Sequence, residues 1–289
     1  MFHVKHIEEE TYMSGMIFVI IFFTVFILLF AIMIYRSVKN SMKVEKMYGE
    51  LIMKEGFRDI MNSSAEKNEF IRKAMKVANS YSNYDRITPA KLIMKEEEGS
   101  TLYVSSASMA TGHTSSPGDV ILLITLPLHI EGTVLIRSRL PNIIESLVSG
   151  VIEGRGLMPV RTENVDKFVL YTTDIRNKNF LTPPVREVLE NYSKITGGAV
   201  SASTMNMGTV IAVTDNILYI SALAHTMYED LYGLVKFGRE LSVATVKSLS
   251  EKKSLPDGGE TTCPSCNEKI TGNNSFCTNC GYQIPFTGN

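Results

Sequence analysis

The stretch MIFVIIFFTVFILLFAIMIY, Met16–Tyr35, decides the architecture that we predict for this chain of 289 residues. Its one interior polar side chain is Thr24. An α-helix rises about 1.5 Å per residue, so a run of this length reaches about 30 Å, the thickness of the hydrocarbon core of a bilayer. Because the run is apolar on every face and ends at Tyr35 and Arg36, we expect a single N-terminal transmembrane helix over residues 16–35.

The residues that flank this run indicate its orientation. Three acids, Glu8 to Glu10, precede it, whereas Arg36, Lys39, Lys43 and Lys46 follow it. Since positively charged flanks stay in the cytosol, residues 1–15 are expected outside the cell and everything after Arg36 inside. A cleaved signal peptide is the alternative, but its apolar core is normally shorter and ends in small residues. The sequence therefore predicts a single-pass protein of the cell membrane with a cytoplasmic C-terminus, in contact with membrane lipid through this helix.

Charge and cysteine content limit the classes of partner. The chain has 29 basic and 30 acidic residues and a net charge of −1, so no overall positive field attracts nucleic acid. All four cysteines lie between Cys263 and Cys280, which leaves the first 262 residues without a possible disulfide. This distribution is typical of a protein in a reducing compartment.

The body of the chain is predicted to be a mixed α+β domain. Juxtamembrane helices are expected over residues 36–84, the α+β domain over 85–246 and a flexible linker over 247–262. The predicted strands are Lys91–Lys95, Thr101–Ser106, Val120–Ile130, Thr133–Arg137, Phe168–Thr172, Ala199–Thr204, Thr209–Val213 and Ile217–Ala222. Glu131, Gly132 and Thr133 are expected to form a hairpin turn. Helices follow Pro141 and Pro183, and a final helix is expected over 226–248; runs of strands with helices at the ends favour the α+β class.

The C-terminus contains two C-x-x-C pairs, Cys263–Cys266 and Cys277–Cys280, with ten residues between them. Two such pairs supply four thiolates, which fill the tetrahedral shell of Zn²⁺ and leave no open position for catalysis. We therefore predict a structural zinc ribbon over residues 263–285, and the pattern resembles the C-terminal zinc ribbons of many archaeal and bacterial proteins. Lys269 is the only basic residue from Cys263 onwards, which opposes nucleic-acid binding by the ribbon and favours a protein partner.

A second resemblance lies in the middle of the chain. Asp166, Phe168, Tyr171 and Asp174, followed by Leu181-Thr182-Pro183, resemble the F-x-x-Y-x-x-D…L-T-P pattern of a family of prokaryotic membrane-anchored proteins of unknown function. The similarity covers roughly residues 166–223. It implies an anchored α+β domain and assigns no reaction.

No catalytic or nucleotide-binding motif is found in the sequence, and we name no catalytic or cofactor-binding residue. The leading hypothesis is a membrane-tethered cytosolic binding or scaffold protein, with a protein partner bound through the domain or the ribbon. One alternative is a membrane-associated enzyme or processing factor whose site assembles from dispersed residues such as Asp166, Asp174 and His225. Another is a nucleic-acid-binding regulator with a basic stripe formed by folding. The sequence does not specify the oligomeric state.

Overall fold

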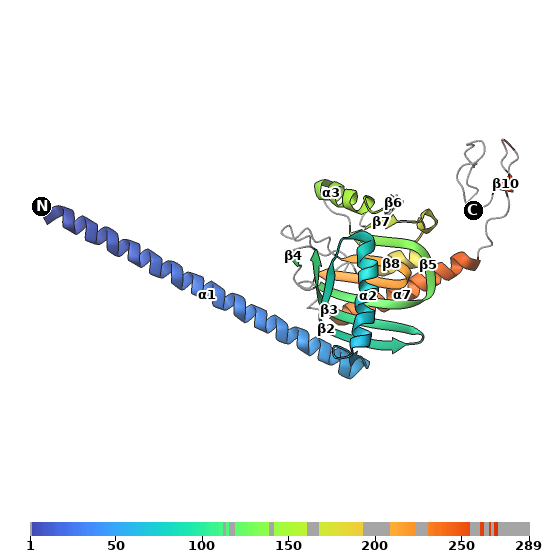
Figure 1. Cartoon of the computed structure of the whole chain (residues 1–289), viewed down its shortest axis with the longest axis horizontal. Helices are drawn as coiled ribbons and strands as arrows, with labels where there is room; N and C mark the ends of the chain where they lie inside the picture. Colours follow the sequence, from blue (N-terminus) through green and yellow to red (C-terminus); the bar gives the residue numbers. More distant parts are fainter. Residues whose placement is uncertain are drawn as a thin grey trace.

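A computed structural model of the chain describes residues 2–111, 114–115, 119–138, 142–160, 168–192, 209–223, 231–254, 261–262, 266 and 269–270. Helix α1, Phe2–Glu55, extends away from a domain in which helices cover both faces of an antiparallel sheet (Figure 1). The C-terminal turns of α1 belong to that domain, because Tyr48 and Leu51 are buried in its core. The described fold is a mixed α/β domain with a helical arm.

The transmembrane helix predicted at 16–35 is contradicted by the structure. Helix α1 does cover these residues, and it continues without a break to Glu55. Within the part of the chain that the structure describes, however, no helix is both long and apolar enough to cross a membrane. The predicted membrane span is corrected on this ground.

The main sheet is built around one long strand, β5, Asp119–Ser138. One edge of β5 pairs with β8, Val210–Leu223, over nearly its whole length. The other edge pairs first with β3, Ser100–Thr111, and then with β7, Phe168–Thr172. The remaining strands extend the sheet outward: β2 (Arg86–Glu97) and β1 (Arg58–Asp59) beyond β3, β4 (Thr114–Ser115) beside β3, and β6 (Met158–Val160) beyond β7.

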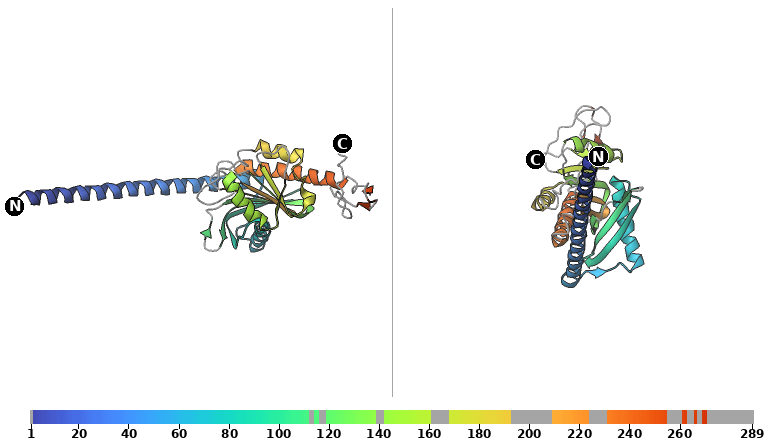
Figure 2. Two further views of the ribbon diagram at one scale, coloured as in Figure 1. Left: turned by 90° about the horizontal axis from the view of Figure 1, so that it is seen from above. Right: turned by 90° about the vertical axis from the view of Figure 1, so that its left-hand side faces the viewer.

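Both faces of the sheet are apolar, and helices cover each of them. Even-numbered residues of β5, such as Leu122, pack with α4 (Pro183–Asn191), α7 (Leu231–Ser254) and the end of α1. Odd-numbered residues of β5, such as Leu123, pack with α2 (Ser64–Tyr81) and α3 (Asn142–Glu153). Figure 2 shows α2 on the side of the sheet opposite to α4 and α7. Polar residues that share these faces are therefore placed inside the protein.

Strand β5 is continuous at residues 131–133, where the sequence predicts a hairpin turn. Its register with β8 shifts twice between Thr125 and Thr133. Gly132 has a φ of +77°, and a Cβ atom there would lie 2.7 Å from the hydroxyl of Thr173. The backbone N–H of Thr133 donates to the same hydroxyl at 2.8 Å. The glycine therefore permits an irregularity inside one strand, and the predicted turn is wrong.

The C-terminal part of the domain also differs from the predicted boundaries. Helix α7 extends to Ser254, into the stretch 247–262 that the sequence predicts as a linker. Ser248 is buried within that extension and donates to the carbonyl of Ala244 at 2.7 Å. Strands β9, Thr261–Thr262, and β10, Lys269–Ile270, form a separate antiparallel pair. The predicted strand at 199–204 lies outside the described residues.

Candidate functional site

The predicted zinc ligands are described only in part. Cys266 lies in a turn between β9 and β10, whereas Cys263, Cys277 and Cys280 lie outside the described residues. In the described ranges, no group of three or more His, Cys, Asp or Glu side chains is placed to hold a metal ion. The zinc ribbon is thus not an element of the described fold, and that part of the predicted architecture is corrected. The assignment of Zn²⁺ to the four cysteines stays a prediction.

The dispersed residues considered for an enzyme are not brought together in the described structure. Asp166 and His225 lie outside the described residues. The Asp174 carboxylate accepts hydrogen bonds from the backbone N–H of Arg176 at 2.9 Å and from its Nε at 2.9–3.0 Å. These bonds lower the pKa of Asp174. The arrangement describes a carboxylate held ionised by a neighbouring guanidinium.

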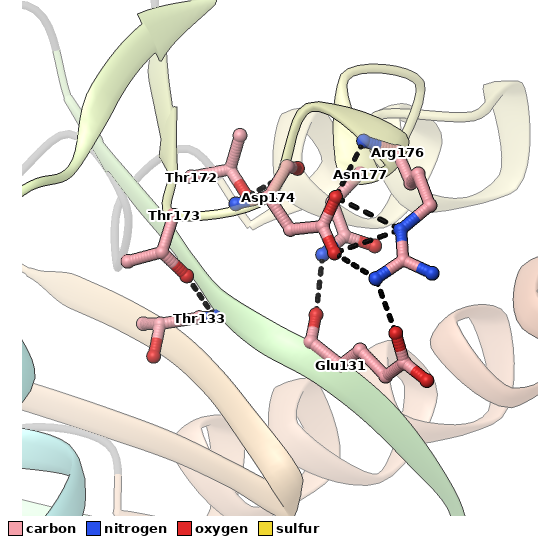
Figure 3. A network of polar contacts seen from close by, with 7 residues as sticks. All are labelled: Glu131, Thr133, Thr172, Thr173, Asp174, Arg176 and Asn177. Atoms are coloured by element: carbon pink, nitrogen blue, oxygen red, sulfur yellow. Dashed lines mark hydrogen bonds and ion pairs between the residues drawn. The ribbon is translucent and has the colours of Figure 1, made fainter.

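Asp174 belongs to a polar network that fixes the irregular part of β5 against the turn after β7 (Figure 3). Arg176 also contacts the Glu131 carboxylate, and the amide of Asn177 donates to the carbonyl of Glu131 at 2.8 Å. The Thr172 hydroxyl accepts from the N–H of Asp174 at 3.1 Å. Since the contacts of Arg176 and Asn177 with Glu131 join the turn after β7 to β5, the network is structural.

The other residues of the F-x-x-Y-x-x-D…L-T-P pattern have structural positions too. Phe168, Tyr171 and Leu181 are buried in the core. Thr182 precedes the first turn of α4, and Pro183 occupies that turn, where a missing N–H costs nothing. The pattern thus describes how β7 leads into α4. The family resemblance that it suggests stays a prediction.

A buried arginine lies near the end of β5. Arg137 is 1% exposed, and its Nη2 donates to the Tyr171 hydroxyl at 2.7 Å. The Ser149 hydroxyl of α3 lies 2.7 Å from the same tyrosine oxygen. The guanidinium carbon also lies 5.2 Å from the centre of the Tyr171 ring, within the range of a cation–π contact. This cluster joins β5, β7 and α3 in the protein interior.

A buried aspartate begins β5, on the same face of the strand as Arg137. Asp119 is 4% exposed, and its Oδ1 has no hydrogen-bond partner among the described residues. Desolvation by burial raises the pKa of Asp119 to about 7. A carboxyl group in this condition is either protonated or in need of a cation.

Three tyrosines surround Asp119. Tyr81 ends α2, Tyr84 follows it and Tyr219 lies on β8; burial raises the pKa of each, and the Asp119 carboxylate adds to the effect on each. The Tyr81 ring lies 6.4 Å from the ring of Tyr84, at an interplanar angle of 79°, and 6.4 Å from that of Tyr219. The Tyr81 hydroxyl is buried and interacts with the hydroxyl of Tyr219, which also contacts Met109 Sδ at 3.6 Å. We call Asp119, Tyr81 and Tyr84 the Asp119 site.

A third cluster of charges lies where α1 joins the domain. Arg239 of α7 contacts Glu55 at 3.1 Å and Glu97 at 2.6 Å. Burial acts to lower the pKa of Arg239, but the two carboxylates raise it overall. Glu55 and Arg239 line a cleft of about 400 Å³ together with Tyr232 and Lys236. These contacts connect the arm to the sheet and to α7.

Sequence reasoning missed both Asp119 and Arg137 as candidate residues. Asp119 follows Pro117 and Gly118 and thus looks like a turn residue, and Arg137 looks like the solvated end of a strand. The available signal was the alternation along β5, because odd-numbered positions share one face of the strand. Asp119 and Arg137 therefore share a face with Leu123, which is buried.

Comparisons with known proteins add little to this geometry. No protein-family model matches the chain, and no curated protein sequence matches it. Among solved structures, the chain is similar to the crystal structure of the mycobacterial trehalose monomycolate transport factor A, TtfA, with 6% sequence identity and a TM-score of 0.37. The match covers 60% of this chain and 92% of that one. A likeness at this level carries no argument about function.

Proposed function

We propose that this chain is a non-enzymatic binding or scaffold protein, in which helix α1 carries the mixed α/β domain and binds a protein partner along its apolar segment. The observation that supports the proposal is the exposure of that segment. Nine large apolar side chains are between 42% and 64% exposed: Phe22, Phe23, Val25, Phe26, Ile27, Leu28, Leu29, Phe30 and Ile32. Contiguous apolar surface of this kind marks an interaction site, because leaving it in water is costly.

The joint between α1 and the domain supports a scaffold role. Tyr48 and Leu51 lie in the core, and Arg239 links Glu55 at the end of α1 to Glu97 of β2. The helix is continuous from the apolar segment to this joint, and the sixteen residue steps from Ile32 to Tyr48 correspond to about 24 Å. A partner bound to the apolar segment would therefore be held at a defined distance from the domain.

The contacts of two carboxylates, Asp174 and Glu97, favour binding over catalysis. Asp174, which was considered for an enzyme site, is engaged by Arg176. Glu97 is likewise engaged by Arg239 and Lys95; burial acts to raise its pKa, but these two cations lower it overall. In these clusters the charges stabilise the fold and are not directed at a substrate.

Site-specific photo-crosslinking in the full chain tests the proposal. A benzoylphenylalanine at Phe26, which is 58% exposed within the apolar segment, is expected to give one discrete adduct with a protein. The matched control is the same probe at Met42, which is 68% exposed on the same helix but outside the segment, and it is expected to give none.

A second variant makes the test specific to the apolar surface. Replacing Phe22 and Phe30 by serine should reduce the adduct at position 26, because it removes much of the apolar area. The domain should unfold at an unchanged temperature, since neither side chain is buried. Adducts with lipid alone, or equal adducts at positions 26 and 42, would contradict binding of a protein partner by this segment.

A further inference from the structure

A row of exposed lysines follows the apolar segment on helix α1. Lys39, Lys43 and Lys46 are all exposed, and they lie four and then three residues apart, so they share one face of the helix. Val25 and Ile32 precede Lys39 and Lys46 at steps of seven residues, which places apolar and basic side chains in one line along α1. We call Lys39, Lys43 and Lys46 the lysine row.

The helix itself offers the lysine row little negative charge. The positions three and four residues away from Lys39 and Lys43 hold no aspartate or glutamate. Lys46 lies 4.0 Å from Glu50, which lies closer to Lys54, at 3.6 Å. Like charges at these spacings destabilise a helix. The row is therefore a cost to the isolated arm, and a carboxylate-bearing surface placed beside it would offset that cost.

We propose that the partner of the apolar segment is a different protein whose apolar groove carries carboxylates at its rim, opposite the lysine row. This inference rests on the proposed function and adds the chemistry of the partner. Charges at the rim of an apolar contact favour a surface of opposite sign, because like charges brought together cost free energy. Since the row lies beyond Ile32, its charge acts across water and mainly raises the rate of association.

The distribution of apolar side chains favours a protein over a lipid surface. A helix that lies on a lipid surface keeps a polar face along its length. At 3.6 residues per turn, the exposed apolar side chains from Phe22 to Ile32 point to nearly all sides of α1. A groove in a protein can enclose such a helix, and the lysine row then meets the rim where α1 leaves the groove.

Photo-crosslinking in cell extract, with the full chain and the benzoylphenylalanine at position 26, tests the inference. After brief mixing at low salt, the variant Lys39→Glu/Lys43→Glu should give about tenfold less protein adduct than the unaltered chain, because it reverses the field that steers association. At 1 M salt, where the Debye length is about 3 Å, the two chains should give equal amounts. Lys39→Arg/Lys43→Arg keeps the charge and should behave as the unaltered chain does.

The control makes the same change in net charge elsewhere. Arg72→Glu/Lys247→Glu alters exposed side chains on α2 and α7, and it should leave the adduct unchanged. Since every altered side chain is exposed, all variants should fold and unfold at the temperature of the unaltered chain.

The outcomes separate this inference from the proposed function. Equal adducts from the charge-reversed and the unaltered chain at low salt would overturn the acidic rim and leave the apolar contact in place. An adduct of two copies of this chain, or adducts with lipid that decrease on charge reversal, would also overturn the inference. If the unaltered chain gives no adduct at all, the proposed function fails, and the inference fails with it.

Discussion

Each end of β5 buries a charged side chain, and the two side chains differ in how their charge is accommodated. Both ends bury a charged side chain on the face covered by α2 and α3. Arg137 is held by the hydroxyl and the ring of Tyr171, in a cluster that includes Ser149. Asp119 has tyrosines around it but no hydrogen-bond partner for Oδ1 among the described residues. The comparison teaches that burial alone does not define a role: a charge with partners connects elements, whereas one without them is available to a proton or a ligand.

Replacement of Arg137 should have the largest effect on stability. Arg137→Met keeps much of the volume but removes the hydrogen bond to Tyr171 and the cation–π contact. We expect a loss of about 2–4 kcal/mol in the free energy of unfolding, measured by urea denaturation. Arg155→Met, at a partly exposed arginine just after α3, is the control and should cost less than about 1 kcal/mol. Equal costs for the two variants would show that the partners of Arg137 contribute little.

Replacement of Asp119 should have the opposite sign, and its size should grow as the pH rises. The pKa of Asp119 is raised from 3.8 to about 7 in the folded chain, so the folded protein retains a proton that the unfolded chain has lost. Its contribution to stability is fully present below pH 3.8, falls as the pH rises towards 7, and is constant above that. Asp119→Asn cannot titrate, so its gain in stability over the unaltered chain should already be present at pH 5 and should grow by roughly 2–3 kcal/mol between pH 5 and pH 8.

Thermal unfolding at pH 5 and pH 8 measures this difference. Asp59→Asn, at an exposed carboxylate, is the matched control and should show no such gain. A gain for Asp119→Asn that is equal at both pH values would mean that the folded aspartate is already ionised at pH 5 and that its pKa is not raised. Asp119 would then not retain its proton on burial, and the contrast with Arg137 would not hold.

The irregular middle of β5 separates its two ends and provides the next test. Gly132→Ala should destabilise the chain, because alanine is strained at a φ of +77° and its Cβ would lie 2.7 Å from Thr173 Oγ1. A cost of about 1–3 kcal/mol is expected by chemical denaturation. Gly99→Ala is the matched control: its φ of +81° imposes similar strain, but nothing lies within 4 Å of the added Cβ. The difference between the two variants isolates the contacts with Thr173 and Asp174.

The sequence predicts much of the sheet and little of its interior chemistry. Strands near Thr101–Ser106 and Phe168–Thr172 are found in the structure as β3 and β7, since both runs are rich in β-branched and aromatic residues. The prediction of a hairpin turn at residues 131–133 is wrong because Gly132 lies against Thr173, which is distant in the sequence. Arg137 was missed because its partner, Tyr171, becomes its neighbour only when β7 pairs with β5. Local patterns carry strand periodicity, but they carry no information on which polar groups meet.

The Arg239 cluster at the base of α1 is an intermediate case and should give the smallest effect. Its side chain is 30% exposed and has two carboxylate partners, Glu55 and Glu97, so it is neither fully buried nor without partners. Water screens such pairs, and we expect Arg239→Gln to cost about 0.5–1 kcal/mol in the free energy of unfolding. High salt should weaken the unaltered chain by a similar amount and leave the variant almost unchanged, because salt screens exposed charges. The control is Lys236→Gln, since Lys236 is 71% exposed and 3.9 Å from Glu240, and its effect should be smaller still. A cost for Arg239→Gln as large as that for Arg137→Met would show that exposure to water does not decide what an ion pair contributes in this fold.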